Sequence, residues 1–526
     1  MRKLIGSDPN QVPSNADLGS MAYQDSNAVT VGKIKADSLS EGELPVLTPS
    51  LLFDFENSQM FDTETITFKR HSRAFAMGPD GHLVQYEQNE PRIDYHPLTG
   101  ECLGLLVEEA RTNVLEDSDR VGINSGAWDG NGSRYFADWA ANVIDPQGRK
   151  KAVVIADFDN TTVNHNMYQY WVQKAGNTVI ENGIYVASIY VKEGTSPQIV
   201  MGIGKGADTT VMKFVFATEK VDFLGRNNYG TGIGNNSSLN YIEDGFVEKL
   251  QNGWYRIGFT YRADNTADSI DPAFQLWNGN SSDPNYTGDT TKYTYIWGPQ
   301  VERCEADSST RARGYPTSYI ETNPDGGATR PADMGYIADV INQKWFNPKR
   351  GTIIAKYAYT YDKYVEGNYP VITGLDNGTS NLRYHIRRFD SQNNSASPQG
   401  SVSVRTRSAY TSNSLNIDGG FGTSGDTETH KTLLCYDVSD GVSDEQYYRH
   451  SHDGEAYDYR EDDNAGRIWK DPIDWNNVGG LTIYFRVGSD SSVPGASSPG
   501  TNAHIKKIAY YPQSVTRKES AELTRI

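Results

Sequence analysis

Residues 252–261, NGWYRIGFTY, give the clearest indication of the fold class, because apolar or aromatic side chains occupy every second position. One face of the expected strand carries Tyr255, Ile257, Phe259 and Tyr261. The other face carries Trp254, Arg256, Gly258 and Thr260. A period of two over this length is typical of a β-strand with one face packed on a core. The sequence therefore predicts a sheet protein, with Trp254 on the outward face of this strand.

Similar short apolar runs recur along the chain, separated by loops rich in Gly, Asn and Ser. In the middle of the chain they are residues 184–191, 211–216, 274–277 and 293–297. Regular short strands with such loops favour a β-sandwich of the jelly-roll type over residues 112–322. The runs GTIIAKYAYTY, GLTIYFRVG and HIKKIAYYP, which begin at positions 351, 480 and 504, predict a second sandwich over residues 323–526.

The N-terminal part of the chain has a different composition. Residues 46–111 hold short strand signals separated by the turns PDG and PLTG, and this pattern predicts a small β unit. Residues 1–45 are polar and have few large apolar side chains, so they cannot bury a core by themselves. The expected fold is therefore all-β: a short extended or helical N-terminal anchor, a small β unit, and two β-sandwiches.

The charge and the cysteine content of the chain limit the classes of partner and of cellular compartment that we expect. The 526 residues carry a formal net charge of -18, which repels phosphate backbones and argues against nucleic acid as a partner. There is no run of 18 apolar residues, and no apolar run follows the short basic start, so we expect neither membrane insertion nor a signal peptide. The three cysteines, Cys102, Cys304 and Cys435, are odd in number and widely spaced, which predicts folding in a reducing cytosol without a disulfide framework.

Several passages together resemble phage tail-fibre and head-fibre structural proteins. They are VPSNADLGSMAYQDS from position 12, NEPRIDYHPLTGECLGLLVEEARTN from 89, NGWYRIGF from 252, YIWGPQVE from 295, YPTSYIET from 315 and ATRPAD from 328. The middle passages resemble the segment before, and the body of, a carbohydrate-binding-like jelly roll in those proteins. GTIIAKY, KKIAYYP and SAEL near the C-terminus resemble a concanavalin A-like, or laminin-G-like, domain.

The resemblance implies a homotrimeric tail fibre, a virion component made in the host cytoplasm that adsorbs to host-surface polysaccharide. Its N-terminus would bind other virion proteins, either a tail adaptor or nozzle or the capsid. The anchoring candidates are Val12, Pro13, Leu18, Met21 and Tyr23. Two alternatives remain open: a capsid (head) fibre or decoration protein, and a glycan-degrading tailspike.

The candidate carbohydrate contacts are aromatic, because sugar rings stack on flat side chains. Trp254 and Trp277 are expected on the outward faces of their strands, although a tryptophan in a sandwich more often packs in the core. Tyr357, Tyr359 and Tyr361 share one face of a strand. This stripe fits a glycan platform, a subunit interface, where tyrosine is enriched, or the core of the sandwich.

No sequence motif points to catalysis, and we expect a binding protein rather than an enzyme. The chain lacks GxSxG, HExxH and a Walker loop, while its 67 acidic residues offer too many carboxylate pairs to identify a glycosidase. The acidic run at residues 453–463 is a candidate for structural calcium, but it lacks EF-hand spacing and reads better as a solvated loop. His450 and His452 adjoin this run, and too few further ligands are assignable for a zinc site.

Overall fold

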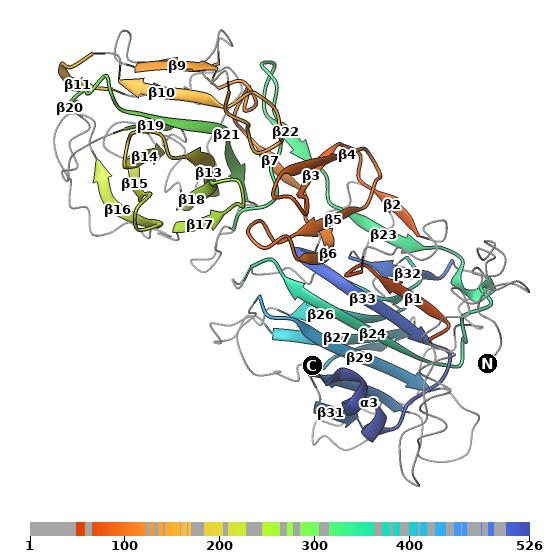
Figure 1. The fold of residues 1–526 in the computed structure, drawn as a ribbon. Helices are drawn as coiled ribbons and strands as arrows, with labels where there is room; N and C mark the ends of the chain where they lie inside the picture. Colours follow the sequence, from red (N-terminus) through yellow and green to blue (C-terminus); the bar gives the residue numbers. More distant parts are fainter. Residues whose placement is uncertain are drawn as a thin grey trace, which may run out of the picture.

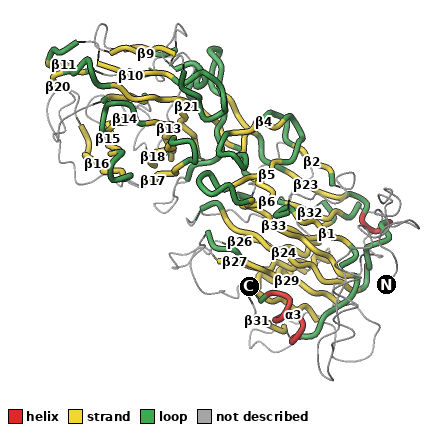
Figure 2. Tube along the Cα trace, viewed as in Figure 1, coloured by secondary structure: helices red, strands yellow, loops and turns green. Residues whose placement is uncertain are grey.

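The computed structural model describes residues 49–525 apart from internal gaps. The longer gaps are residues 58–65, 170–182, 228–244, 263–270, 277–284, 305–314, 362–370, 390–398, 418–426, 438–446, 460–474, 476–481 and 489–500. Strands dominate both halves of the molecule, so the all-β prediction is confirmed (Figure 2). No helix in the described part is long and apolar enough to cross a bilayer.

The first sandwich, here called the central sandwich, consists of two facing sheets (Figure 1). One sheet has the order β17 (Gly245–Lys249), β18 (Trp254–Arg262), β13 (Ile184–Lys192), β21 (Tyr293–Arg303), β10 (Val153–Asp157) and β9 (Tyr135–Trp139). The other has the order β16 (Lys220–Asn227), β15 (Thr209–Val215), β14 (Gln198–Ile203), β19 (Pro272–Gln275), β12 (Met167–Tyr168) and β8 (Asp129–Gly130). A small pair, β11 (Thr162–Asn164) and β20 (Asn285–Thr287), lies beside them.

The C-terminal sandwich also has two sheets. One has the order β31 (Glu455–Tyr459), β30 (Tyr447–His452), β29 (His430–Asp437), β24 (Arg350–Tyr359), β33 (Ala503–Tyr511), β6 (Cys102–Val107) and β5 (Arg92–Tyr95), with β1 (Leu51–Asp54) also on β33. The other has the order β2 (Thr67–Lys69), β23 (Met334–Ile337), β32 (Tyr484–Val487), β25 (Val371–Asp376), β26 (Leu382–Phe389), β27 (Gln399–Ser408) and β28 (Thr411–Ile417).

Short helical elements accompany the C-terminal sandwich in the part of the chain that the structure describes. The turn η2 (Val340–Asn342) buries Val340, and the helix α3 (Arg517–Thr524) packs on β30 and β31. The helix begins with a capping box, in which the Thr516 side chain accepts from the Glu519 amide and the Glu519 carboxylate accepts from the Thr516 amide. This reciprocal pair satisfies two amides that would otherwise lack an intrahelical partner.

Residues 46–111 contribute strands to the C-terminal sandwich. β1, β5 and β6 extend one of its sheets, and β2 extends the other. Only β3 (Ala74–Met77) and β4 (Leu83–Tyr86) form a sheet of their own, among the described strands of this segment. The boundaries predicted at residues 45, 111 and 322 stay predictions, but the pairing shows that this segment completes the sheets of a sandwich whose other strands come some 230 or more residues later.

Two short crossings connect the sandwiches. Residues 108–110 separate β6, in the C-terminal sandwich, from β7 (Arg111–Asn113), which pairs with β21. Residues 331–333 separate β22 (Ala328–Arg330), which pairs with β7, from β23. The crossings bond to each other: the Asp333 amide donates to the Glu108 carbonyl at 2.9 Å, and the Glu108 amide donates to Asp333 Oδ2 at 3.0 Å.

A buried network of charges surrounds these crossings, with side chains at most 6% exposed. Glu108 pairs with Arg92 at 2.9 Å and with Arg330 at 3.0 Å. Asp333 pairs with Arg70 at 2.9 Å and also with Arg92. Burial acts to raise the pKa of Glu108, but the guanidiniums of Arg330 and Arg92 and two hydrogen bonds from Ser318 together outweigh it and hold the pKa at about 2. Glu108 therefore stays ionised between Arg92 and Arg330, and Asp333 lies between Arg70 and Arg92.

Candidate functional site

The structure places the side chain of Trp254 in a buried core, so the prediction that it faces outward is wrong. Its side chain is 0% exposed and its indole N–H donates to the Ile144 carbonyl at 2.9 Å. It packs with Phe75, Met77, Leu83, Ala152, Tyr190, Leu250, Trp297 and Tyr319. The hairpin β3–β4 and the segment around Tyr319 thus cover the face that the sequence left open. A glycan cannot reach this ring without displacing that core.

Two of the three tyrosines in the stripe belong to the interior of the C-terminal sandwich, which is the third of the interpretations offered by the sequence. Tyr357 and Tyr359 are 1% and 4% exposed and lie in the core between the two sheets. Tyr361 is also buried and stacks on Tyr315, with ring centroids 3.6 Å apart and planes 3° apart. The stripe is therefore not an exposed glycan platform.

The remaining predicted contacts fall outside the described residues. Trp277 follows Leu276, the last described residue after β19. The anchoring candidates Val12, Pro13, Leu18, Met21 and Tyr23 all precede residue 49. Their proposed roles stay predictions.

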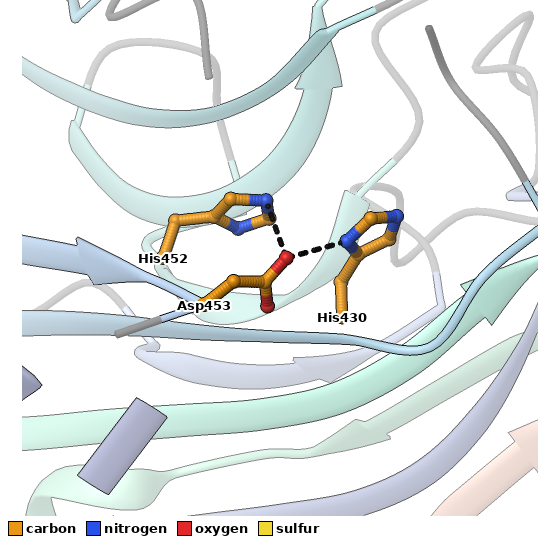
Figure 3. A group of neighbouring side chains, drawn as sticks. All are labelled: His430, His452 and Asp453. Atoms are coloured by element: carbon orange, nitrogen blue, oxygen red, sulfur yellow. Dashed lines mark hydrogen bonds and ion pairs between the residues drawn. The ribbon is translucent and has the colours of Figure 1, made fainter. Parts of the chain in front are cut away.

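The acidic run contains a strand and supplies one member of a compact cluster. Residues 455–459 form β31 rather than part of a solvated loop, and residues 460–463 are not described. Asp453 occupies the turn between β30 and β31 with φ +46°, a left-handed conformation that aspartate tolerates better than most residues. Its side chain meets His430 and His452, which come from neighbouring strands (Figure 3).

Strand register explains why these residues meet. Thr432 lies opposite His452 in the antiparallel pair β29–β30. His430 is two residues before Thr432, so it shares the same face of the sheet. Tyr357 lies opposite His430 in the neighbouring strand β24 and faces the core. The two imidazoles therefore sit at the rim of the sandwich interior, stacked with centroids 5.1 Å apart.

Both histidines approach the same carboxylate oxygen. His430 Nδ1 is 2.8 Å and His452 Nε2 is 3.2 Å from Asp453 Oδ2 (Figure 3). The other oxygen, Oδ1, accepts from the Lys431 amide at 2.8 Å. Burial acts to raise the pKa of Asp453, but the contacts with His430, the Lys431 amide and His452 together lower the pKa below its ordinary value. The carboxylate is therefore held ionised and oriented.

A second layer of contacts fixes the imidazole of His452. Its Nδ1 lies 2.8 Å from Thr432 Oγ1, and this hydroxyl lies 3.0 Å from the Tyr357 hydroxyl. With Nδ1 engaged by Thr432, Nε2 is the nitrogen directed at Asp453. The side chains of His430, His452 and Asp453 are 14%, 11% and 27% exposed, so a small solute can reach them.

The sequence alone identified only part of this cluster. His452 and Asp453 were recognised as neighbours in the chain, but His430 lies 22 residues earlier and has no fixed spacing to them. Only the register of β29 against β30 shows that the three belong together. The cluster could have been found from a histidine on each of two antiparallel strands. That requires knowing that β29 pairs with β30, which the sequence does not show.

Comparisons with known proteins give distant likenesses only. No protein-family model and no curated protein matches the chain. A Ruminococcus gnavus IT-sialidase CBM40 aligns with a TM-score of 0.23 and 15% identity, over 34% of this chain and 84% of that one. Trypanosoma rangeli sialidase in complex with sialic acid aligns with a TM-score of 0.23 and 7% identity, over 74% of this chain and 60% of that one. TM-scores this low carry no argument about function, which must come from the residues of this chain.

Proposed function

We propose that the protein is a structural fibre subunit of a phage particle that attaches the particle to host-surface glycans. The observation that carries this proposal is the joint between the sandwiches. Two crossings of three residues each, 108–110 and 331–333, run side by side and bond to each other. A buried network of five charged side chains encloses them.

Such a joint suits a spacer that holds a binding module at a fixed position. A flexible linker spreads the module over a large volume, and this lowers the effective concentration at which a second copy meets its target. A joint with paired crossings keeps the two sandwiches in one orientation. In a homotrimer, three copies presented in this way turn weak sugar binding into firm adsorption.

The passages that resemble phage fibre proteins supply four of the five charged side chains of this joint, all but Arg70. Arg92 and Glu108 lie in the passage from position 89, and Arg330 and Asp333 lie in ATRPAD. We infer that these two passages have a mechanical role, which is to connect the two sandwiches rigidly. This supports a structural role on the virion, whether the N-terminal segment binds a tail adaptor or the capsid.

Binding of the purified full-length protein to a panel of immobilised bacterial surface polysaccharides tests the proposal. We expect at least one polysaccharide to be bound, and Trp277→Ala to weaken that binding while Leu98→Ala, at a side chain 45% exposed, leaves it unchanged. Release of reducing ends from the bound polysaccharide would instead support the tailspike alternative. Absence of the chain from purified phage particles would refute the virion role.

A further inference from the structure

We propose that His430, His452 and Asp453 form a binding site for a divalent transition-metal cation of the zinc class. One nitrogen from each imidazole and one oxygen of the carboxylate lie within 4.8 Å of one another. All three side chains come from one hairpin and its following turn, β29, β30 and the Asp453 turn. The site is independent of the proposed role in adsorption.

The spacing of the donor atoms fits a tetrahedral ion. Zinc binds imidazole nitrogen and carboxylate oxygen at about 2.0–2.2 Å, so two ligand atoms of one tetrahedron lie about 3.4 Å apart. His430 Nδ1 and His452 Nε2 are 2.8 Å and 3.2 Å from Asp453 Oδ2. An ion can therefore replace these two direct contacts through small rotations of the side chains. Three protein ligands leave a fourth position for water or another small ligand.

The surrounding contacts orient the donors before any ion arrives. Thr432 Oγ1 engages Nδ1 of His452 at 2.8 Å, which directs Nε2 of that ring into the cluster. The Lys431 amide holds Oδ1 of Asp453 at 2.8 Å, which directs Oδ2 at both histidines. The Tyr357 hydroxyl in turn lies 3.0 Å from Thr432 Oγ1. Outer contacts of this kind fix the ring orientation of metal-ligating histidines and raise metal affinity.

The donor set also predicts which cation is chosen. Calcium and magnesium prefer cages of oxygen ligands, whereas imidazole nitrogen suits zinc and the neighbouring transition metals. Two imidazoles and one carboxylate therefore favour zinc over calcium. A bound ion would tie β29 to the turn that leads into β31 and would stabilise this corner of the C-terminal sandwich against local opening.

The test uses untagged full-length protein, freed of metal with a chelator and titrated with zinc by calorimetry. We expect one zinc per chain at this site, no competition from calcium, and a rise in Tm on adding zinc. His430→Gln and His452→Gln should each weaken binding at least about tenfold. His504→Gln is the matched control, because His504 pairs with Asp94 at 2.7 Å with similar exposure (13% and 15%), and it should leave zinc binding unchanged.

A second measurement keeps the result independent of how the variants fold. Cobalt added to the metal-free wild-type protein should give the intense visible absorption of a tetrahedral site, and zinc should abolish it. If the wild-type protein binds no zinc at a free zinc concentration of about 100 µM, the three residues form only a hydrogen-bonded cluster. Equal zinc binding by the wild type and both histidine variants would also overturn the proposal.

Discussion

Replacing Glu108 by glutamine should loosen the joint between the two sandwiches. The carboxylate of Glu108 receives hydrogen bonds from the Ser318 amide at 2.7 Å and the Ser318 hydroxyl at 2.6 Å, and it pairs with Arg92 and Arg330. A glutamine keeps the shape but removes the charge, and its amide nitrogen cannot accept from a guanidinium. Three buried cations, those of Arg70, Arg92 and Arg330, would then remain with Asp333 as the one carboxylate left in this network.

The magnitude follows from the pKa of Glu108. Folding lowers this pKa from an ordinary 4.5 to about 2, a difference worth about 3 kcal/mol. Because the pKa is depressed in the folded state, the stabilisation is complete above about pH 4.5 and is lost as the pH falls towards 2. A loss of about 3 kcal/mol lowers the Tm of a domain of this size by roughly 6–12 °C.

Differential scanning fluorimetry at pH 7 and pH 3 measures this effect. We expect Glu108→Gln to lower Tm at pH 7, and the gap from the wild type to shrink to less than half by pH 3. Glu219→Gln is the control, since Glu219 forms an exposed pair with Lys249 and should leave Tm unchanged. A Glu108→Gln protein that melts within about 2 °C of the wild type at pH 7 would refute the reasoning.

Three further substitutions test the packing. Trp254→Ala should lower the free energy of unfolding by about 3–5 kcal/mol, because it leaves a cavity at a fully buried site. Chemical denaturation measures this loss, and an unchanged midpoint would contradict the burial of Trp254. Tyr357→Phe should cost about 1 kcal/mol by removing the hydroxyl that contacts Thr432, and thermal unfolding without metal measures it; a Tm equal to that of the wild type would argue against this contact. Gly104→Ala should lower the free energy of unfolding by more than about 1 kcal/mol, because φ is +105° and an added Cβ would lie 2.5 Å from the Ile505 carbonyl oxygen. Limited proteolysis measures this effect, and resistance equal to that of the wild type would contradict the predicted strain.

Much of the fold was predictable because alternation is a local property. Tyr255, Ile257, Phe259 and Tyr261 share one face of β18 as expected, and they pack on or in the core of the central sandwich. The capping box was also predictable from the sequence, because its two residues, Thr516 and Glu519, are only three positions apart. The sequence did not predict that the β3–β4 hairpin covers the opposite face of β18, because this hairpin lies about 170 residues earlier in the chain.

The positions of many strands, and hence the all-β class, could be predicted from the residues alone, because the pleat of a strand gives neighbouring residues a period of two. Tertiary structure alone decided which faces are exposed, as the burial of Trp254 and Tyr357 shows. It also decided which polar residues meet. The partners of Glu108 and of Asp453 come from distant strands or across a hairpin, and only the pairing register brings them within hydrogen-bonding distance.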